Sequence, residues 1–156
     1  MAIYVTSDAH GHVRALDEAL SKISLTSDDT LYVLGDMIDR GPDPVGVIKL
    51  VRSLPNARVL KGNHEQIMLD AIIGQDPLDA ETWDINGGWT TREQLNDMEF
   101  EAYEELVRWM AALPLYAVAE TEERPYLLVH AGIEMKAARA FLLEHGVDCA
   151  DGVGAV

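Results

Sequence analysis

Four short apolar runs in this chain each end directly in a polar motif, and this repeated pattern constrains the fold more than any other feature. In chain order the motifs are Asp8-Ala9-His10, Gly35-Asp36 through Arg40-Gly41, Gly62-Asn63-His64-Glu65 and Val129-His130-Ala131-Gly132. Apolar runs of this length are typical of buried strands. Because the carboxyl ends of parallel strands meet at one edge of a sheet, we predict that all four motifs emerge at that edge.

Segments with helical spacing lie between the apolar runs. Strands are predicted at residues 2–7, 30–34 and 57–60, and helices at residues 13–23, 44–54 and 65–73. Strands that alternate with helices predict parallel pairing and right-handed crossovers.

The second half of the chain has a different pattern. The stretch 74–88 is rich in Asp, Pro and Gly and predicts an irregular loop. Beyond it the sequence predicts helices at 89–96 and 101–112, strands at 115–119 and 126–130 that can pair as a hairpin, and a last helix at 135–145. Trp83, Trp89 and Trp109 are expected in the core, and Asn86 is expected to be a turn residue.

Composition limits the class of protein and its partners. The chain has 156 residues, of which 48% are hydrophobic and 25% charged, as expected for a single globular domain over residues 1–156. Its formal net charge of −15 repels nucleic acid and anionic lipid over most of the surface. No apolar run approaches the roughly 20 residues needed to span a bilayer. The single cysteine, Cys149, cannot form an internal disulfide, so a cytoplasmic location is expected.

The polar motifs contain the side chains that bind divalent metals. Asp8 and His10 are two residues apart, so both can reach one ion, and we expect them to bind a first metal. Asp36 has two carboxylate oxygens and is predicted to bridge two ions. Asn63 and His130 offer a carbonyl oxygen and a ring nitrogen for a second metal. This mixed nitrogen and oxygen set favours Mn, Fe or Zn over magnesium alone.

Residues next to these ligands are predicted to act on a substrate. His64 follows Asn63 and is expected to point away from the metal, as a general acid. Asp39 could accept a hydrogen bond from the other ring nitrogen of His64, with helix or loop capping as the alternative role. Arg40 offers a planar fork of donors suited to two phosphate oxygens. Glu65 is interpreted as a first-turn helix residue favoured by the helix dipole, not as a catalyst.

The strings DAH, GDMIDRG, GNHE and VHAG resemble those of the calcineurin-like metallophosphoesterases, and most closely the bacterial and phage serine/threonine phosphatase branch. Trp83 and Asn86-Gly87-Gly88 also resemble a Trp-x-x-Asn-Gly-Gly signature of that branch. The resemblance implies an α/β sandwich of β-sheets flanked by helices, with a dinuclear Mn or Fe/Zn site.

The same resemblance implies how the site residues divide. The first-metal ligands are Asp8, His10 and Asp36, and the second-metal ligands are Asp36, Asn63 and His130. A metal-bridging hydroxide attacks phosphorus in line, His64 is the acid, Asp39 its partner and Arg40 the phosphate clamp. Bound metals also supply the positive charge that a phosphorylated substrate needs on this acidic chain.

The chain departs from the family pattern after VHAG. Members continue into further strands of a second sheet, and one of these segments supplies another metal-binding histidine and commonly a phosphate-binding arginine. In this chain the only later histidine is His145, at a predicted helix end, and the only later arginine is Arg139. The expectation is therefore a domain shortened at its C-terminus, lacking part of the second sheet, with a weakened second metal site.

Three functions follow as expectations. The first is hydrolysis of phosphate monoesters, on phosphoserine or phosphothreonine of a phosphoprotein or on a small phosphoester. The second is hydrolysis of a dinucleoside polyphosphate, since bis(5'-nucleosyl)-tetraphosphatases share these motifs. The third is a non-catalytic module that binds metal or phosphate.

Overall fold

The computed structural model describes residues 1–74, 76–144 and 146. The predictions made for His145 and Cys149 lie outside these residues. Within the described part, no helix is long and apolar enough to cross a membrane. The cytoplasmic location and the single-domain organisation stay predictions.

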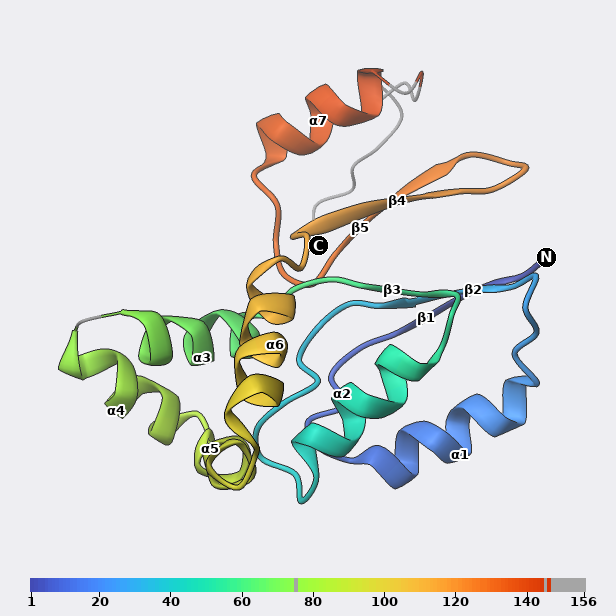
Figure 1. Cartoon of the computed structure of the whole chain (residues 1–156). Helices are drawn as coiled ribbons and strands as arrows, with labels where there is room; N and C mark the ends of the chain where they lie inside the picture. Colours follow the sequence, from blue (N-terminus) through green and yellow to red (C-terminus); the bar gives the residue numbers. More distant parts are fainter. Residues whose placement is uncertain (75, 145, 147–156) are drawn as a thin grey trace.

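A three-stranded parallel sheet lies at the centre of the first half of the chain. Its strands β1 (Ile3–Thr6), β2 (Thr30–Val33) and β3 (Ala57–Val59) follow the order β1-β2-β3. Helices α1 (Val13–Ile23) and α2 (Pro44–Ser53) connect them and lie together on one side of the sheet (Figure 1). The predicted alternation of strands and helices, with parallel pairing, is confirmed.

Strand β2 has both neighbours and supplies the most buried side chains of the sheet. It pairs Thr30 with Ile3 on one side and Leu31 with Ala57 on the other. Leu31 and Val33 are each only 1% exposed. A strand that is paired on both edges and buried reads as a nearly continuous apolar run, which is why residues 30–34 are easily recognised as a strand in the sequence.

Four helices follow the sheet, and they pack beside it rather than on the α1 and α2 side (Figure 1). They are α3 (Asn63–Ile73), α4 (Pro77–Ile85), α5 (Trp89–Asn96) and α6 (Phe100–Ala111). The predicted boundaries of α5 are confirmed. Helix α3 begins two residues before its predicted start, so Asn63 and His64 lie in its first turn and not at a strand end.

The expectation of an irregular loop at residues 74–88 is wrong, because most of this stretch is α4. Pro77 occupies the first turn, where a missing N–H costs nothing, and the side chain of Asp76 accepts the N–H of Leu78 at 2.9 Å. Trp83 is 3% exposed and anchors the helix in the core. The Pro and Asp residues that suggested a loop therefore begin a helix. Asn86 ends it, as the predicted turn residue, by donating to the carbonyl of Thr82 at 2.8 Å.

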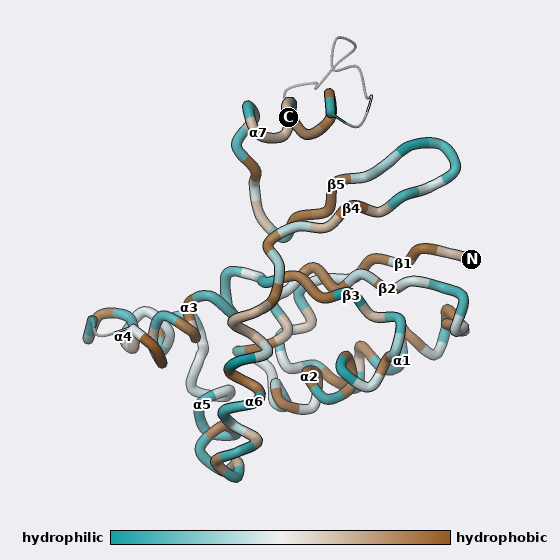
Figure 2. The backbone as a smooth tube through the Cα atoms, turned by 45° about the horizontal axis from the view of Figure 1, so that its top comes forward, coloured by the Kyte–Doolittle hydropathy of each residue, from teal (hydrophilic) through white to brown (hydrophobic). Residues whose placement is uncertain are grey.

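The predicted hairpin forms, but as a sheet of its own. Strands β4 (Tyr116–Glu120) and β5 (Pro125–Val129) pair antiparallel and stand apart from β1, β2 and β3, with a hydrophilic tip (Figure 2). Helix α7 (Met135–Glu144) follows β5. The hydroxyl of Tyr32 in β2 donates to the carbonyl of Val118 in β4 at 3.2 Å and links the two sheets. The prediction that all four motifs leave one sheet is therefore wrong for the fourth, which leaves β5.

The core lies between the parallel sheet and the helices around it. Its most buried members include Met37, Ile38, Val47, Met68 and Met110. Trp83 belongs to it, and Trp109 packs against it, as expected. Trp89 does not, since it is 57% exposed.

Candidate metal centre

The loops that follow β1 and β2 hold an unusual backbone conformation exactly where the predicted site residues lie. Asp8, His10, Asp36, Asp39 and Arg40 have φ values of 57°, 38°, 54°, 69° and 66°. Side chains with a Cβ rarely adopt this left-handed conformation, and such strain persists only where the surroundings enforce it. Its concentration in two adjoining loops marks this edge of the sheet as the candidate functional site.

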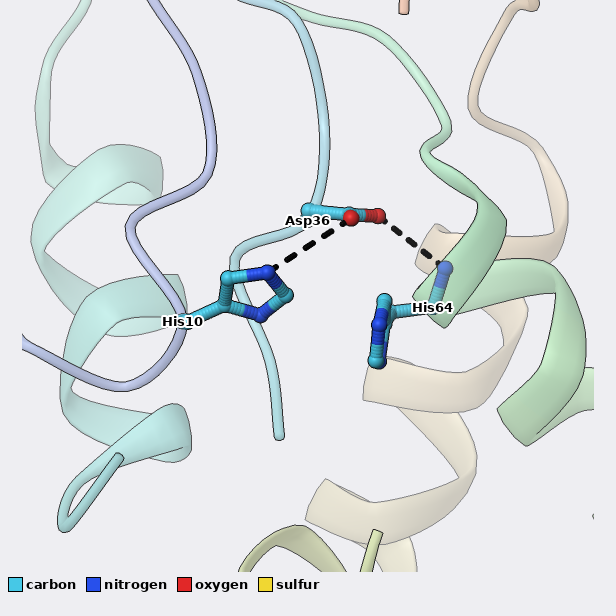
Figure 3. A group of neighbouring side chains, drawn as sticks. All are labelled: His10, Asp36 and His64. Atoms are coloured by element: carbon cyan, nitrogen blue, oxygen red, sulfur yellow. Dashed lines mark hydrogen bonds and ion pairs between the residues drawn. The ribbon is translucent and has the colours of Figure 1, made fainter. Parts of the chain in front are cut away.

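Asp36 lies at the middle of the cluster and is buried. Its Oδ2 is 3.7 Å from Nε2 of His10 and 3.3 Å from Nε2 of His130. Its Oδ1 accepts the backbone N–H of His64 at 3.0 Å, where the helix dipole of α3 favours a negative charge. Figure 3 shows His10 and His64 on either side of this carboxylate. Asp36 thus has the central position expected of a bridging ligand.

His10 presents Nε2, and not Nδ1, on the side of Asp36. Its Nδ1 lies 2.8 Å from the carbonyl oxygen of Ile38, so Nδ1 carries the proton and donates. Nε2 is then unprotonated, as a metal ligand must be. Asp8 Oδ1 lies 3.9 Å from this Nε2, and the Asp8 side chain is 59% exposed. The three predicted first-metal ligands are therefore brought together.

The predicted second-metal ligands also meet, although they come from different sheets. Nε2 of His130, at the end of β5, is 2.9 Å from Oδ1 of Asn63, in the first turn of α3. Nδ1 of His130 is buried and has no hydrogen-bond partner among the described residues. Two oxygens, of Asn63 and Asp36, thus face one ring nitrogen.

The chemistry of these donors fits a pair of divalent cations. Metal-binding atoms lie within 4.8 Å of one another in two groups, which divide the residues differently from the predicted ligand sets: His10 with Asp36 and His64, and Asp8 with Asp36 and His130. Both groups contain Asp36. A cation would relieve the crowding of lone pairs around Asp36 Oδ2, and these nitrogen and oxygen donors are those that Mn, Fe and Zn accept.

His64 and Asp39 form a buried pair beside the cluster. Nδ1 of His64 donates to Oδ2 of Asp39 at 2.7 Å, and the side chains are 1% and 0% exposed. The alternative capping role of Asp39 is not seen, because its carboxylate is taken up by side chains. The rings of His64 and His10 pack edge to face with centroids 4.7 Å apart.

Arg40 spans the two histidines. One guanidinium nitrogen donates to Nε2 of His10 at 3.0 Å and another to Nε2 of His64 at 2.8 Å. A guanidinium has no acceptor, so both Nε2 atoms carry lone pairs in this arrangement. Arg40 is exposed, so solvent and small ligands can reach its guanidinium fork.

Glu65 contributes more to the site than its sequence position suggested. It is fully buried, and its carboxylate accepts the N–H groups of Asp36, Met37 and Gly62 at 2.9, 2.8 and 2.7 Å. Burial raises the pKa of Glu65 above its usual range, against the opposing effect of these three hydrogen bonds. The prediction of a first-turn position is confirmed, but sequence reasoning missed that Glu65 ties two motif loops together.

Sequence reasoning also did not predict that two further residues, Trp83 and Thr91, support the site. Trp83 Nε1 and Thr91 Oγ1 both donate to the carboxylate of Asp39. The Trp-x-x-Asn-Gly-Gly string was the only sequence signal near them.

A pocket of about 470 Å³ opens next to the second group of donors. Its lining includes Lys61, Asn63, Tyr116, His130 and Ile133. Volumes of this size are typical of small-molecule sites. The ammonium group of Lys61 donates to the carbonyl of Ala111 at 3.1 Å.

Metal-binding side chains around a buried carboxylate, with a buried histidine and aspartate pair at the end of parallel strands, form an arrangement suited to metal-assisted hydrolysis. The chain belongs to the calcineurin-like phosphoesterase family, whose sequence profile matches residues 1–149.

Its relatives agree with this assignment. The chain is 32% identical over 136 residues to the symmetrical bis(5'-nucleosyl)-tetraphosphatase of Erwinia tasmaniensis, covering 85% of this chain and 45% of that protein. The corresponding protein of Salmonella paratyphi C is 31% identical over 163 residues, covering 100% of this chain and 50% of that protein. The chain thus spans about half the length of these relatives.

Solved structures support the fold. A metallophosphoesterase from Sphaerobacter thermophilus superposes with a TM-score of 0.52 at 27% identity, over 75% of this chain and 42% of its own. A serine/threonine phosphatase from Saccharomyces cerevisiae gives a TM-score of 0.62 at 21% identity, over 85% of this chain and 38% of its own. The second likeness concerns the fold alone.

Proposed function

We propose that this chain hydrolyses phosphate esters or anhydrides with the help of two divalent cations, and that its substrate is a dinucleoside polyphosphate. The position of Asp36 between two donor groups is the observation that supports metal-assisted hydrolysis. The likeness to symmetrical bis(5'-nucleosyl)-tetraphosphatases supports the substrate better than it supports the phosphoprotein expected first from the motifs. The pocket beside His130, with Tyr116 and Lys61 at its wall, offers a place for a nucleoside and its phosphates.

Each residue has a defined task in this reaction. Asp8, His10 and Asp36 would hold one cation, and Asp36, Asn63 and His130 the other. The cations, Mn or Fe/Zn, supply charge neutralisation and an activated water when bound.

The remaining residues act on the phosphate and the leaving group. Arg40 would turn its fork from the histidines to the phosphate oxygens, which frees Nε2 of His64 to carry a proton. Water attacks phosphorus and releases one proton to solvent, the bond from phosphorus to the leaving oxygen breaks, and that oxygen takes the Nε2 proton of His64. Asp39 stabilises the charged ring of His64 before the transfer.

Turnover of three substrates tests the proposal. The purified chain, loaded with Mn²⁺, is assayed on diadenosine tetraphosphate, on a phosphoserine peptide and on p-nitrophenyl phosphate. We expect the first to be hydrolysed with the highest kcat/KM, and His64→Asn to lower it by about 100-fold or more. A preference for the phosphopeptide would restore the phosphoprotein function. Cation binding without any hydrolysis would instead identify a non-catalytic metal-binding module.

A further inference from the structure

The segment from Trp83 to Thr91, which ends α4 and begins α5, holds the backbone of the loop that carries Asp39 and Arg40. The N–H of Asp39 donates to Thr91 Oγ1 at 2.9 Å, and the N–H of Arg40 donates to the carbonyl of Gly87 at 3.1 Å. Both donors belong to residues with left-handed φ values of 69° and 66°. A strained pair persists only where neighbours enforce it, and these two bonds do so.

The same segment also fixes the Asp39 side chain. Thr91 Oγ1 donates to Oδ1 at 2.6 Å, and Trp83 Nε1 lies 3.0 Å from Oδ1 and 3.2 Å from Oδ2. Asp39 and Thr91 are 0% exposed and Trp83 is 3% exposed, so water does not compete for these bonds. With Oδ1 occupied, Oδ2 is directed to the Nδ1 proton of His64, 2.7 Å away.

The hydroxyl of Thr91 can take only one orientation. It accepts from the Asp39 N–H and donates to the Asp39 carboxylate, which uses its single proton. Neighbouring Thr90 differs, because its hydroxyl makes only a 3.4 Å contact with the carbonyl of Gly87. The chain thus contains a matched pair of buried threonines, of which one touches Asp39.

We propose that Thr91 and Trp83 are positioning residues, which act through Asp39 to fix the tautomer and ring orientation of His64 so that Nε2 faces the leaving oxygen of the substrate. The effect on turnover rests on the proposed function. The orientation of His64 does not, and it can be measured without substrate.

Nuclear magnetic resonance of the full chain labelled with ¹⁵N-histidine tests the orientation. The Nδ1–H signal of His64, assigned by its loss in His64→Asn, should exchange with solvent about tenfold or more faster in Thr91→Val and Trp83→Phe, because a buried hydrogen-bonded proton exchanges only on local opening. Thr91→Ser keeps the hydroxyl and should restore slow exchange. Thr90→Val, at the neighbouring buried threonine, is the matched control, and Trp89→Phe makes the same change of residue type at an exposed position. Unchanged exchange in Thr91→Val and Trp83→Phe would overturn the proposal. If Thr91→Val does not fold, Trp83→Phe and Thr91→Ser still decide it.

Dependence on the leaving group tests the catalytic consequence. A general acid matters most for a poor leaving group, so Thr91→Val should lower kcat on phenyl phosphate by about tenfold or more and on p-nitrophenyl phosphate by less than about twofold. An equal loss on both substrates would indicate a merely structural role and would contradict positioning. If the wild-type chain hydrolyses neither of these esters nor diadenosine tetraphosphate, the proposed function fails, while the exchange measurement still decides the positioning of His64.

Discussion

The carboxylate of Glu65 accepts the backbone N–H of Asp36 at 2.9 Å, so a side chain of the third motif holds the backbone of the second. The same carboxylate accepts the amides of Met37 and Gly62. Three buried donors from two loops thus depend on one side chain. Because Glu65 binds the N–H of Asp36, it helps to hold the left-handed backbone of Asp36 at φ 54°. Asp36 belongs to both candidate donor groups, so Glu65 also supports the position of the shared carboxylate.

Replacing Glu65 by leucine should destabilise the fold strongly. The change keeps much of the volume but leaves three buried N–H groups without an acceptor, and we expect the free energy of unfolding to fall by about 3 kcal/mol or more. Urea denaturation followed by circular dichroism measures this loss. Glu81→Leu, on the exposed part of α4, is the control and should change stability by less than about 0.5 kcal/mol. Equal stability of the two variants would show that Glu65 does not tie the loops together.

Gly35 lies where the second and third motif loops come close together. Its φ is 101°, and a Cβ there would lie 2.3 Å from the backbone nitrogen of Gly62. Gly35→Ala therefore combines a forbidden conformation with a backbone clash, and we expect it to cost about 3 kcal/mol or more. A thermal melt compares it with Gly132→Ala, where the added methyl group meets nothing within 4 Å. Similar melting temperatures for the two variants would contradict the close approach.

Cation stoichiometry tests the shared role of Asp36. Asp36→Asn keeps one carbonyl oxygen but loses the charge and the second acceptor, so it can serve at most one cation. We expect elemental analysis after dialysis against Mn²⁺ to give about two ions per wild-type chain and one or fewer for the variant. Asp17→Asn, at an exposed position of α1, should match the wild type. Removal of the ions by a chelator should abolish hydrolysis, and their return should restore it.

Asp29 gives the fold a dependence on pH away from the site. Hydrogen bonds from the Ala2 amide and from the hydroxyl and amide of Thr26 lower the pKa of Asp29 below its usual range. Because the pKa of Asp29 is lower in the folded state, ionised Asp29 stabilises the fold fully at pH values above the ordinary pKa of an aspartate. This stabilisation is lost as the pH falls through the lowered pKa of the folded state. Asp29→Ala should therefore lower the melting temperature at pH 7 and lower it less at pH 3. A gap between wild type and variant that is the same at both pH values would contradict this effect.

The sequence predicted the strands and α1 well because their signals are local. Apolar runs and helical spacing in the first 60 residues correspond directly to β1, β2, β3 and the helices between them. The candidate ligands and the His64 and Asp39 pair could be placed from motifs that follow these strands. Their distances confirm that these residues meet, while their roles as ligands stay predictions.

What the sequence did not predict depends on contacts between distant residues. Trp83 and Thr91 meet Asp39 across 44 and 52 positions, and Glu65 meets Asp36 across 29. The Trp-x-x-Asn-Gly-Gly string marks Trp83, but no local pattern shows which distant residue such a side chain contacts. Helix α4 was missed for the same reason, since its burial through Trp83 outweighs a composition that locally favours a loop. The hairpin of β4 and β5 was predicted, but the motif after β5 was expected at the edge of the parallel sheet, because an apolar run shows that a strand forms but not which sheet it joins.

His130 reaches the site from a strand outside the parallel sheet, and this has a consequence for the order of assembly during synthesis. Its contact with Asn63 closes a loop of 67 positions, whereas Asp8, His10, Asp36 and Asn63 all lie within the first 63 residues. Contacts close in sequence form before distant ones, because closing a long loop costs more chain entropy. On the ribosome, the amino-terminal part of a chain is also available first. The nascent chain can therefore bring Asp8, His10, Asp36 and Asn63 together before β5 has been synthesised. His130 then joins a site whose other predicted ligands are already in place.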